Sequence, residues 1–485
     1  MDSLAFLGAA ALARRLRSGR LGSLELLEHQ LARIARHNPT LNAVIQLDAA
    51  GARRKARAAD ARLRRGEAVG PLHGVPMTVK ESFDVRGLPT TWGLPAHARR
   101  RATRDAVAVQ RLEAAGAIVI GKTNVPVMLA DWQAFNAVYG TTRNPWALDR
   151  SPGGSSGGAA AALAAGLTPL EIGSDIGGSI RIPAHCCGVY GHRPTYGLVP
   201  TGGHALPGAE VALDINVVGP LARSAGDLAL AFGVLAGEEA GSPWRLALAP
   251  SRRTRLRDFR VAVLPTSPVA PAERAVRAAL GSLATLLESN KARVSRTAKP
   301  RIPMAEAFTL YVHLLRAATA ALQMHDPKAF DAAVAVAKRL PPRDHSYYAE
   351  QLRGNTMHHR DWLIANERRH ALAGAWTDFF RDHDLLLCPA APIVAFPHDH
   401  VGERWQREVL VDGRRRSVNE HLFWAGYSGL FGLPSTVAPI GRDASGLPVG
   451  VQIVGAPGAD LECIRFAQLL ERELGRFSPP PAFAD

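Results

Sequence analysis

Hydrophobic positions follow two different periods in the first part of the chain. Within residues 1–66, apolar side chains such as Leu27 and Leu31 recur three or four positions apart. This spacing places them on one face of an α-helix, so the region is expected to be helical. The run Pro76–Val79 is continuously apolar and ends on Lys80, which favours a short buried strand instead.

Helix and strand patterns then alternate. Asp105–Ala115 predicts a helix that ends at Gly116, and Ala117–Ile120 predicts a buried strand. Ala159–Ala165 is rich in alanine, the best helix former, while the glycine density of Gly173–Arg181 predicts a loop or tight turn. Alternation of this kind is typical of an α/β core.

The second half contains a long helical region, about 303–381, between segments with strand patterns. The elements expected there are helices over Met304–Leu322, Lys328–Leu340, His359–Phe380 and Phe423–Phe431, and strands over Phe259–Leu264, Leu385–Cys388 and Val449–Val454. No repeat or convincing linker divides the sequence, so one large domain is favoured over two.

Composition excludes several classes of function. Hydrophobic residues make up 47% of 485 residues, which is enough for a large core. The formal charge of +15 comes mainly from arginine, which is spread along the chain without an aromatic-interleaved basic stripe, so nucleic-acid binding is not expected. No apolar run approaches the ~20 residues of a membrane span. The first apolar run precedes its arginines, the reverse of a secretory signal.

Cysteine usage favours a reducing compartment. The four cysteines, Cys186, Cys187, Cys388 and Cys463, form no CxxC pair and match no metal-ligand spacing. A cytoplasmic location without a metal site is the simplest expectation.

The stretch 151–194 carries the densest candidate chemistry. It holds two glycine-flanked serines, Ser155 in GGSSGG and Ser179 in DIGGSIR. Glycine is costly to order and is retained where the backbone must turn or approach a ligand closely. Consecutive N–H groups from Ile176 to Ser179 would suit a developing oxyanion. A pair of Ser/Gly-rich surface loops is the alternative.

Two familiar motifs match only in letters. Gly116–Thr123, GAIVIGKT, fits the Walker A expression, but a helix precedes it and its four intervening residues favour a buried strand over a phosphate loop. Gly153–Gly157 fits GxSxG, but the preceding NPWALDRSP cannot form the strand of a nucleophile elbow. We interpret both matches as accidental. Nearby His73, His185 and His192 leave a histidine-assisted serine open as an alternative.

Lys80 suggests a different way to activate a serine. The chain uses arginine for most cations, yet it places a lysine after the apolar run that ends at Val79. Burial can lower the pKa of a lysine until it serves as a neutral base, which arginine cannot do. Such a lysine can relay a proton through one serine to a second. A strand-end lysine that reaches solvent is the alternative.

Together these segments resemble the amidase signature family. The resemblance is strong over residues 20–230 and 420–470 and weak between them. The matching segments are GVPMTVKESFDV around Lys80, GKTNVP at Gly121–Pro126, GTTRNPW at Gly140–Trp146, GGSSGG around Ser155, GSDIGGSIRIPA around Ser179, GPLARS at Gly219–Ser224 and GLPVGVQIVG at Gly446–Gly455.

The resemblance implies one α/β domain over residues 1–485, with a mixed central β-sheet flanked by helices and a signature core at about 70–230. It implies Ser179 as nucleophile, Ser155 as bridging serine in a cis peptide, and Lys80 as general base. No metal or organic cofactor is implied.

Further positions carry over one by one. The oxyanion hole is expected from the N–H groups of Ile176, Gly177, Gly178 and Ser179. Asp175 corresponds to a supporting residue, and Leu129 aligns with a position that lines the acyl pocket.

The expected function is hydrolysis of a carboxamide to a carboxylate and ammonia or an amine through an acyl-enzyme, with hydrolysis of esters left open. The alternative is the glutaminase-type subunit of a tRNA-dependent amidotransferase. Such subunits typically have Ser-Leu-Asp-Gln before the Gly-Pro pair, where this chain has Ala212–Val218, ALDINVV. Val127 and the His192-Arg193 pair also depart from common family patterns. The oligomeric state stays open, with a homodimer as one candidate.

The substrate pocket is expected to be shaped by residues 303–430. Aromatic side chains there are candidates for its wall, although core packing suits each equally. These residues are Phe308, Tyr311, Trp362, Phe423 and Trp424.

Overall fold

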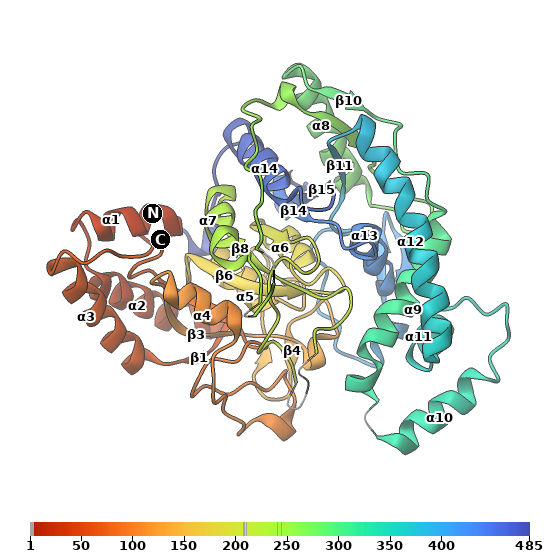
Figure 1. Ribbon diagram of the computed structural model, residues 1–485, viewed down its shortest axis with the longest axis horizontal. Coiled ribbons are helices and arrows are strands. Elements are labelled where there is room, and N and C mark those ends of the chain that lie inside the picture. Colours follow the sequence, from red (N-terminus) through yellow and green to blue (C-terminus); the bar gives the residue numbers. More distant parts are fainter. Residues whose placement is uncertain (1–3, 207–208, 210, 240, 244, 325) are drawn as a thin grey trace.

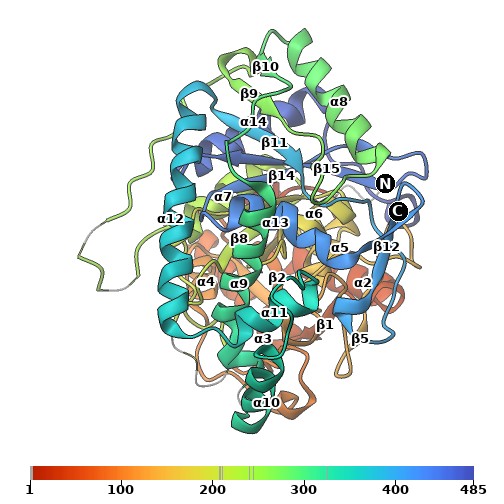
Figure 2. The same cartoon turned by 90° about the vertical axis from the view of Figure 1, so that its right-hand side faces the viewer.

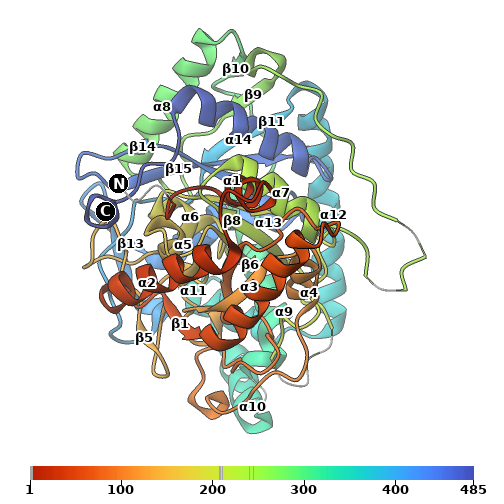
Figure 3. The same ribbon diagram turned by 90° about the vertical axis from the view of Figure 1, so that its left-hand side faces the viewer.

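The computed structural model describes residues 4–206, 209, 211–239, 241–243, 245–324 and 326–485. Three helices dominate the first 66 residues, as expected: α1 (Ala9–Arg17), α2 (Ser23–Leu41) and α3 (Ala49–Arg64). They lie at the left of Figure 1 and in front in Figure 3. The prediction missed strand β1 (Val44–Leu47) between α2 and α3, because four residues are too few to establish a period of two.

A small three-stranded sheet follows these helices. Its order is β1-β3-β2, in which β3 (Ile118–Thr123) pairs antiparallel with β1 and parallel with β2 (Pro76–Lys80). Both β2 and β3 are fully buried. The predicted strand at Pro76–Val79 is confirmed, and Lys80 is its last residue. Helix α4 (Val107–Ala114) leads into β3.

The central sheet has eight strands in the order β10-β9-β11-β15-β14-β7-β8-β6. Strand β11 is parallel to β9, and β9 to β10, whereas every other neighbouring pair is antiparallel. The sheet is therefore mixed, as expected. In chain order the strands are β6 (Leu170–Asp175), β7 (Tyr190–Arg193), β8 (Val217–Ala222), β9 (Arg260–Val263), β10 (Arg293–Ser295), β11 (Leu385–Pro389), β14 (Ser435–Arg442) and β15 (Pro448–Gly455).

Helices flank this sheet (Figure 1). Two of them pack together beside β6 and β7: α5 (Gly157–Ala164) and α6 (Arg181–Cys187). Another pair, α7 (Ala225–Leu235) and α14 (Asp460–Leu474), packs against β8 and β14, while α8 (Arg274–Ser289) contacts β10 and β11. One large hydrophobic cluster joins these layers and a second lies between α2, β3 and α5.

A helical region covers the opposite end of the molecule, in front in Figure 2. It consists of α9 (Met304–Gln323), α10 (Pro327–Ala337), α11 (Tyr347–Asn355) and α12 (His359–Asp382), with α13 (His421–Gly429) packed against α9. The predicted helices over 304–322, 328–340, 359–380 and 423–431 are confirmed, and α11 was missed. The two remaining hairpins are β4 (Phe135–Asn136) with β5 (Gly140–Thr141), and β12 (Glu408–Val411) with β13 (Arg414–Ser417).

The prediction of a loop over Gly173–Arg181 was wrong at both ends. Gly173–Asp175 completes β6, and Arg181 begins α6, so the irregular segment is only 176–180. At Gly173 an added Cβ would lie 2.6 Å from Ser156 Oγ. This glycine therefore allows close packing against the GGSSGG segment rather than a turn.

No helix in the described residues is long and apolar enough to cross a lipid bilayer.

Candidate active site

Lys80 lies at the end of β2, beside the edge strand β6 of the central sheet. Its side chain is completely buried, and Nζ donates to Ser155 Oγ at 2.7 Å and to Ser174 Oγ at 2.9 Å. The lysine does not reach solvent, so the alternative of an exposed strand-end cation is wrong. The structure thus brings Lys80 and Ser155 together, as the resemblance implies.

Burial lowers the pKa of Lys80 from 10.5 to about 7, because the charged ammonium loses its hydration. Asp175, Glu171 and Glu81 oppose this effect and raise the pKa, but they do not overcome it. A large fraction of the side chain is nevertheless neutral near pH 7.

Ser155 follows a cis peptide bond between Gly154 and Ser155. The flanking glycines are needed for close packing: an added Cβ would lie 2.4 Å from Asp131 O at Gly154, and 2.3 Å from Asn124 N at Gly158. No strand occurs in residues 144–156, so the GxSxG match is not a strand-to-helix nucleophile elbow.

Ser179 lies in the irregular segment between β6 and α6. The main chain ties this segment to GGSSGG, since Ser156 N donates to Ser179 O at 3.1 Å. Ser155 and Ser179 are 1% and 6% exposed and line one pocket. The two glycine-flanked serines therefore form a single buried site rather than two surface loops.

Asp175 holds the segment 176–180 in place through hydrogen bonds from its main-chain N–H groups. Its carboxylate accepts Gly178 N at 2.9 Å and Ile180 N at 3.1 Å, and it forms a two-pronged ion pair with Arg181. Burial alone would raise the pKa of Asp175, but the guanidinium groups of Arg181 and Arg193 hold it well below its usual range. The carboxylate is therefore ionised and rigidly held.

Two further hydrogen bonds set the direction of the peptide groups around Ser179. Tyr311 Oη donates to Ile176 O at 2.5 Å, and Ile182 N donates to Gly178 O at 2.7 Å. The C=O and N–H of a trans peptide point in opposite directions. The N–H groups of Gly177 and Ser179 therefore point away from Tyr311 and from α6, respectively.

Of the four N–H groups expected to form the oxyanion hole, one is not free. Gly178 N–H donates to the Asp175 carboxylate. The peptide group between Gly177 and Gly178 is also fixed by Trp132 Nε1, which donates to Gly177 O at 3.0 Å. The four-donor expectation needs this correction. No protein acceptor among the described residues takes the N–H of Ile176, Gly177 or Ser179.

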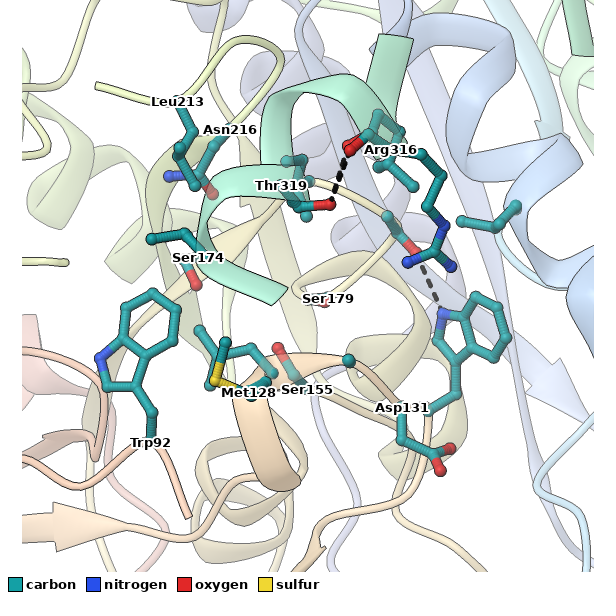
Figure 4. Close-up of a pocket in the computed structure, with 18 of the residues that line it drawn as sticks. Trp92, Met128, Asp131, Ser155, Ser174, Ser179, Leu213, Asn216, Arg316 and Thr319 are labelled. Atoms are coloured by element: carbon teal, nitrogen blue, oxygen red, sulfur yellow. Dashed lines mark hydrogen bonds between the residues drawn. The ribbon is translucent and has the colours of Figure 1, made fainter. Parts of the chain in front are cut away.

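Figure 4 shows the pocket around the serines. Trp92 lies on one side of Ser155 and Ser179, and Arg316 and Asp131 lie on the other. Leu129, which the resemblance places in the acyl pocket, is part of the wall. The remaining lining residues are Met128, Ala130, Trp132, Ser174, Ile176, Gly177, His204, Leu213, Asn216, Leu315, Thr319, Leu322, Arg404 and Leu422.

The helical region contributes to the wall, as predicted, but through different residues from those expected. Helix α9 supplies Leu315, Arg316, Thr319 and Leu322. None of the five candidate aromatic residues lines this pocket, and all five pack in or against the hydrophobic core. The pocket's aromatic residues, Trp92 and Trp132, come from the signature core instead.

Several residues of the site were missed, among them Ser174 and His204. Ser174 contacts Lys80 directly, but it lay in a segment assigned to a loop. His204 lines the pocket and approaches Ser82 Oγ at 3.0 Å, and burial lowers its pKa to about 3, so it is neutral. His204 lies 25 positions after Ser179, and no motif around it indicates a place in the site.

Neither a histidine-assisted serine nor a phosphate-binding loop finds support. His73 contacts Ala59 O, His185 lies between Gly450 and Ile393, and His192 contacts Thr436 and Asp460, so none reaches the serines. Ile118–Thr123 of the Walker A match is the buried strand β3, as predicted. Within the described ranges, no group of His, Cys, Asp or Glu side chains could hold a metal ion.

Comparison with known proteins places this chain in a family. The sequence profile of the amidase family matches residues 25–464. The chain is 35% identical to the glutamyl-tRNA(Gln) amidotransferase A-subunit of Anaeromyxobacter sp. (strain K), over 95% of both chains. It is 32% identical to indoleacetamide hydrolase of Bradyrhizobium diazoefficiens, over 91% of this chain and 82% of the relative. The crystal structure of a bacterial aryl acylamidase of the amidase signature family superposes with a TM-score of 0.80 at 25% identity, covering 99% and 98% of the two chains.

Proposed function

Because this chain belongs to the amidase signature family and is therefore a hydrolase of C–N bonds, we propose that it hydrolyses a small or medium carboxamide through a Ser179 acyl-enzyme. The contact of buried Lys80 Nζ with Ser155 Oγ at 2.7 Å carries the proposal. It joins a lysine that is about half neutral at pH 7 to a serine in the same pocket as Ser179.

Acylation needs a proton to leave the nucleophile. Neutral Lys80 takes the proton of Ser155 while Ser155 takes that of Ser179, whose Oγ attacks the amide carbonyl carbon. The resulting oxyanion accepts hydrogen bonds from the free N–H groups of Ile176, Gly177 and Ser179. Each such donor contributes about 3 kcal/mol to stabilising the transition state.

The proton then returns along the same path. Lys80 gives it back through Ser155 to the amine nitrogen as the C–N bond breaks, which releases ammonia or an amine. Water attacks the ester at Ser179, its proton passes to the relay, and collapse releases the carboxylic acid and restores the Ser179 hydroxyl. Besides the amide and water, these steps use only side chains and main-chain N–H groups of the protein.

A covalent label tests the assignment of the nucleophile. A fluorophosphonate should form one adduct, located on Ser179 by peptide mass spectrometry, and Ser179→Ala should abolish both labelling and amide hydrolysis. An adduct on Ser155 or Ser156, or a folded Ser179→Ala protein that retains more than a few per cent of the wild-type rate, would overturn it. Circular dichroism and thermal melting of the variant provide the folding control.

The similarity to the A-subunit of an amidotransferase favours a second candidate, a glutaminase-type subunit that works within a tRNA-dependent complex. The ALDINVV segment, in place of Ser-Leu-Asp-Gln, counts against it. Purified chain that hydrolyses generic aliphatic or aryl amides without partner or ATP would support the stand-alone amidase. Activity restricted to glutamine and dependent on partner subunits would support the second candidate.

A further inference from the structure

The pocket has a cationic side that the proposed proton relay does not use. Arg316 on α9 and Arg404 both line it, and Figure 4 shows Arg316 across the serines from Trp92. The Arg404 guanidinium lies 5.4 Å from the centre of the Trp132 ring, another residue of the wall. The two arginines share a partner, because Tyr347 Oη accepts from each of them, so they belong to one part of the wall.

Arg316 is buried without the partners that a buried guanidinium normally has. It is 6% exposed, one of its nitrogens donates to Tyr347 Oη, and its Nε–H is buried with no acceptor among the described residues. By contrast, buried Arg181 donates to a carboxylate and to three further acceptors. Buried Arg223 also has an Nε–H without an acceptor among the described residues, but its other two nitrogens donate to four carbonyl groups. Leaving a buried charged donor unpaired is costly.

The nearby acids offset this charge only in part. Asp131 lines the same wall and is attracted by Arg404, but its Oδ2 pairs with Arg407 Nη1 at 2.6 Å, and its Oδ1 accepts no hydrogen bond from the described residues. Glu350 on α11 accepts from His313 at 2.7 Å and from His345 at 2.8 Å. Among the described residues, no carboxylate forms an ion pair with either Arg316 or Arg404.

Tyr347 does not supply the missing negative charge either. Burial opposes ionisation of its phenol, yet the guanidinium groups of Arg316 and Arg404 lower its pKa to about 8. The phenol is thus mostly neutral at pH 7, and its lowered pKa reports a positive field in this wall.

From this arrangement we propose that Arg316 and Arg404 form an anion subsite that binds a carboxylate carried by the substrate while the scissile amide lies at Ser179. The substrate class is therefore an amide with a carboxylate elsewhere in the molecule. A guanidinium matches a carboxylate in geometry, and the buried position strengthens the pair. The proposal rests on the proposed amidase function, whose chemistry it narrows to a substrate class.

Matched substrates test the subsite in the wild-type chain. One pair places the charge on the acyl side: glutaryl 4-nitroanilide against 5-oxohexanoyl 4-nitroanilide, in which a methyl ketone replaces the carboxylate. The other places it on the amine side: 4-acetamidobenzoate against 4-acetamidoacetophenone. The subsite predicts a kcat/KM about ten- to a hundredfold higher for the carboxylate member of at least one pair, the range expected for a charge-assisted hydrogen bond.

Variants locate the source of the preference. Arg316→Met and Arg404→Met should each reduce the ratio of kcat/KM values within the preferred pair toward one. Arg296→Met is the matched control, because Arg296 is an exposed arginine paired with Glu288, and it should leave the ratio unchanged. If Arg316→Met fails to fold, the proposal is still tested by Arg404→Met and by the ratio of kcat/KM values that the wild type shows within each pair.

The outcomes separate this proposal from the proposed function. Equal kcat/KM values within both pairs, with turnover observed, would overturn the subsite and leave the amidase assignment intact. If no substrate is turned over, calorimetric titration of Ser179→Ala with the same four compounds decides. Tighter binding of a carboxylate member that is lost with Arg316→Met supports the subsite, and equal binding within both pairs overturns it.

Discussion

Ser174 Oγ lies 2.9 Å from Lys80 Nζ, so the buried amine has a second hydroxyl partner besides Ser155. A neutral amine has two N–H groups and one lone pair. When one N–H is donated to Ser174, the lone pair is free to face the proton of Ser155. Ser174 therefore orients the amine of Lys80.

Ser174→Ala should lower kcat about tenfold with little change in KM, because one buried hydrogen bond contributes about 1–1.5 kcal/mol. Steady-state kinetics on one amide checks this. Ser267→Ala is the matched control, because Ser267 is equally buried but bonds to Met304 and Val269 instead. A Ser174→Ala enzyme with wild-type kcat would show that Ser174 does not orient the Lys80 amine.

Tyr311→Phe should lower kcat by about 10- to 100-fold while KM changes little. The hydroxyl holds Ile176 O, and through that peptide group it directs the Gly177 N–H that we assign to the oxyanion. The measurement is kcat and KM for an amide and for the corresponding ester.

Tyr427→Phe is the control for this change, because the buried Tyr427 hydroxyl has no hydrogen-bond partner among the described residues. Both variants lose one buried hydroxyl, but only Tyr311→Phe frees the peptide. Equal effects of the two substitutions on kcat would show that the Tyr311 hydroxyl does not position the donor.

Glu171→Gln should change how stability depends on pH. Burial raises the pKa of Glu171 from 4.5 to about 8, against the opposing hydrogen bond from Thr78. Between these values the folded protein keeps a proton that the unfolded chain has lost, so stability falls as pH rises, by at most about 1.4 kcal/mol per pH unit. Glutamine has no proton to lose, so the variant should lack this decline.

Urea unfolding of wild type and Glu171→Gln at pH 5, 5.5 and 6 measures the effect below the Lys80 pKa of about 7. Relative to the variant, the wild type should lose stability steadily over this range. Exposed Glu288→Gln is the control and should run parallel to the wild type. Parallel curves for Glu171→Gln and wild type would mean that Glu171 is ionised in the folded protein.

The sequence allowed the proposed reacting residues, which the structure brings together at one pocket, to be singled out, but not their surroundings. Lys80, Ser155 and Ser179 stand in motifs whose residue types already restrict the chemistry. Ser174 was missed because glycine density was interpreted as a turn, although Gly173 allows β6 to approach Ser156. A glycine needed for close packing and a glycine needed for a turn look the same in one sequence.

The pocket wall was harder to predict for a related reason. Helical periodicity places Arg316 and Thr319 on one face of α9. It does not reveal whether that face contacts the core, solvent or a pocket. The aromatic residues of this region were the obvious candidates. They pack in or against the core, where burial of their large apolar surface is most favourable. The pocket wall is formed instead by the α9 residues Leu315, Arg316, Thr319 and Leu322.

The central claim is that Lys80 is the base, and the pH dependence of kcat/KM for one amide tests it most directly, with wild type measured beside Lys80→Arg. Because burial lowers the pKa of Lys80 to about 7, the wild-type value should rise with pH through a single ionisation near 7 and level off above it. Lys80→Arg should lose at least about a hundredfold at every pH, since arginine keeps its proton. Near-wild-type amide hydrolysis by a folded Lys80→Arg protein, with the same pH profile, would contradict the account.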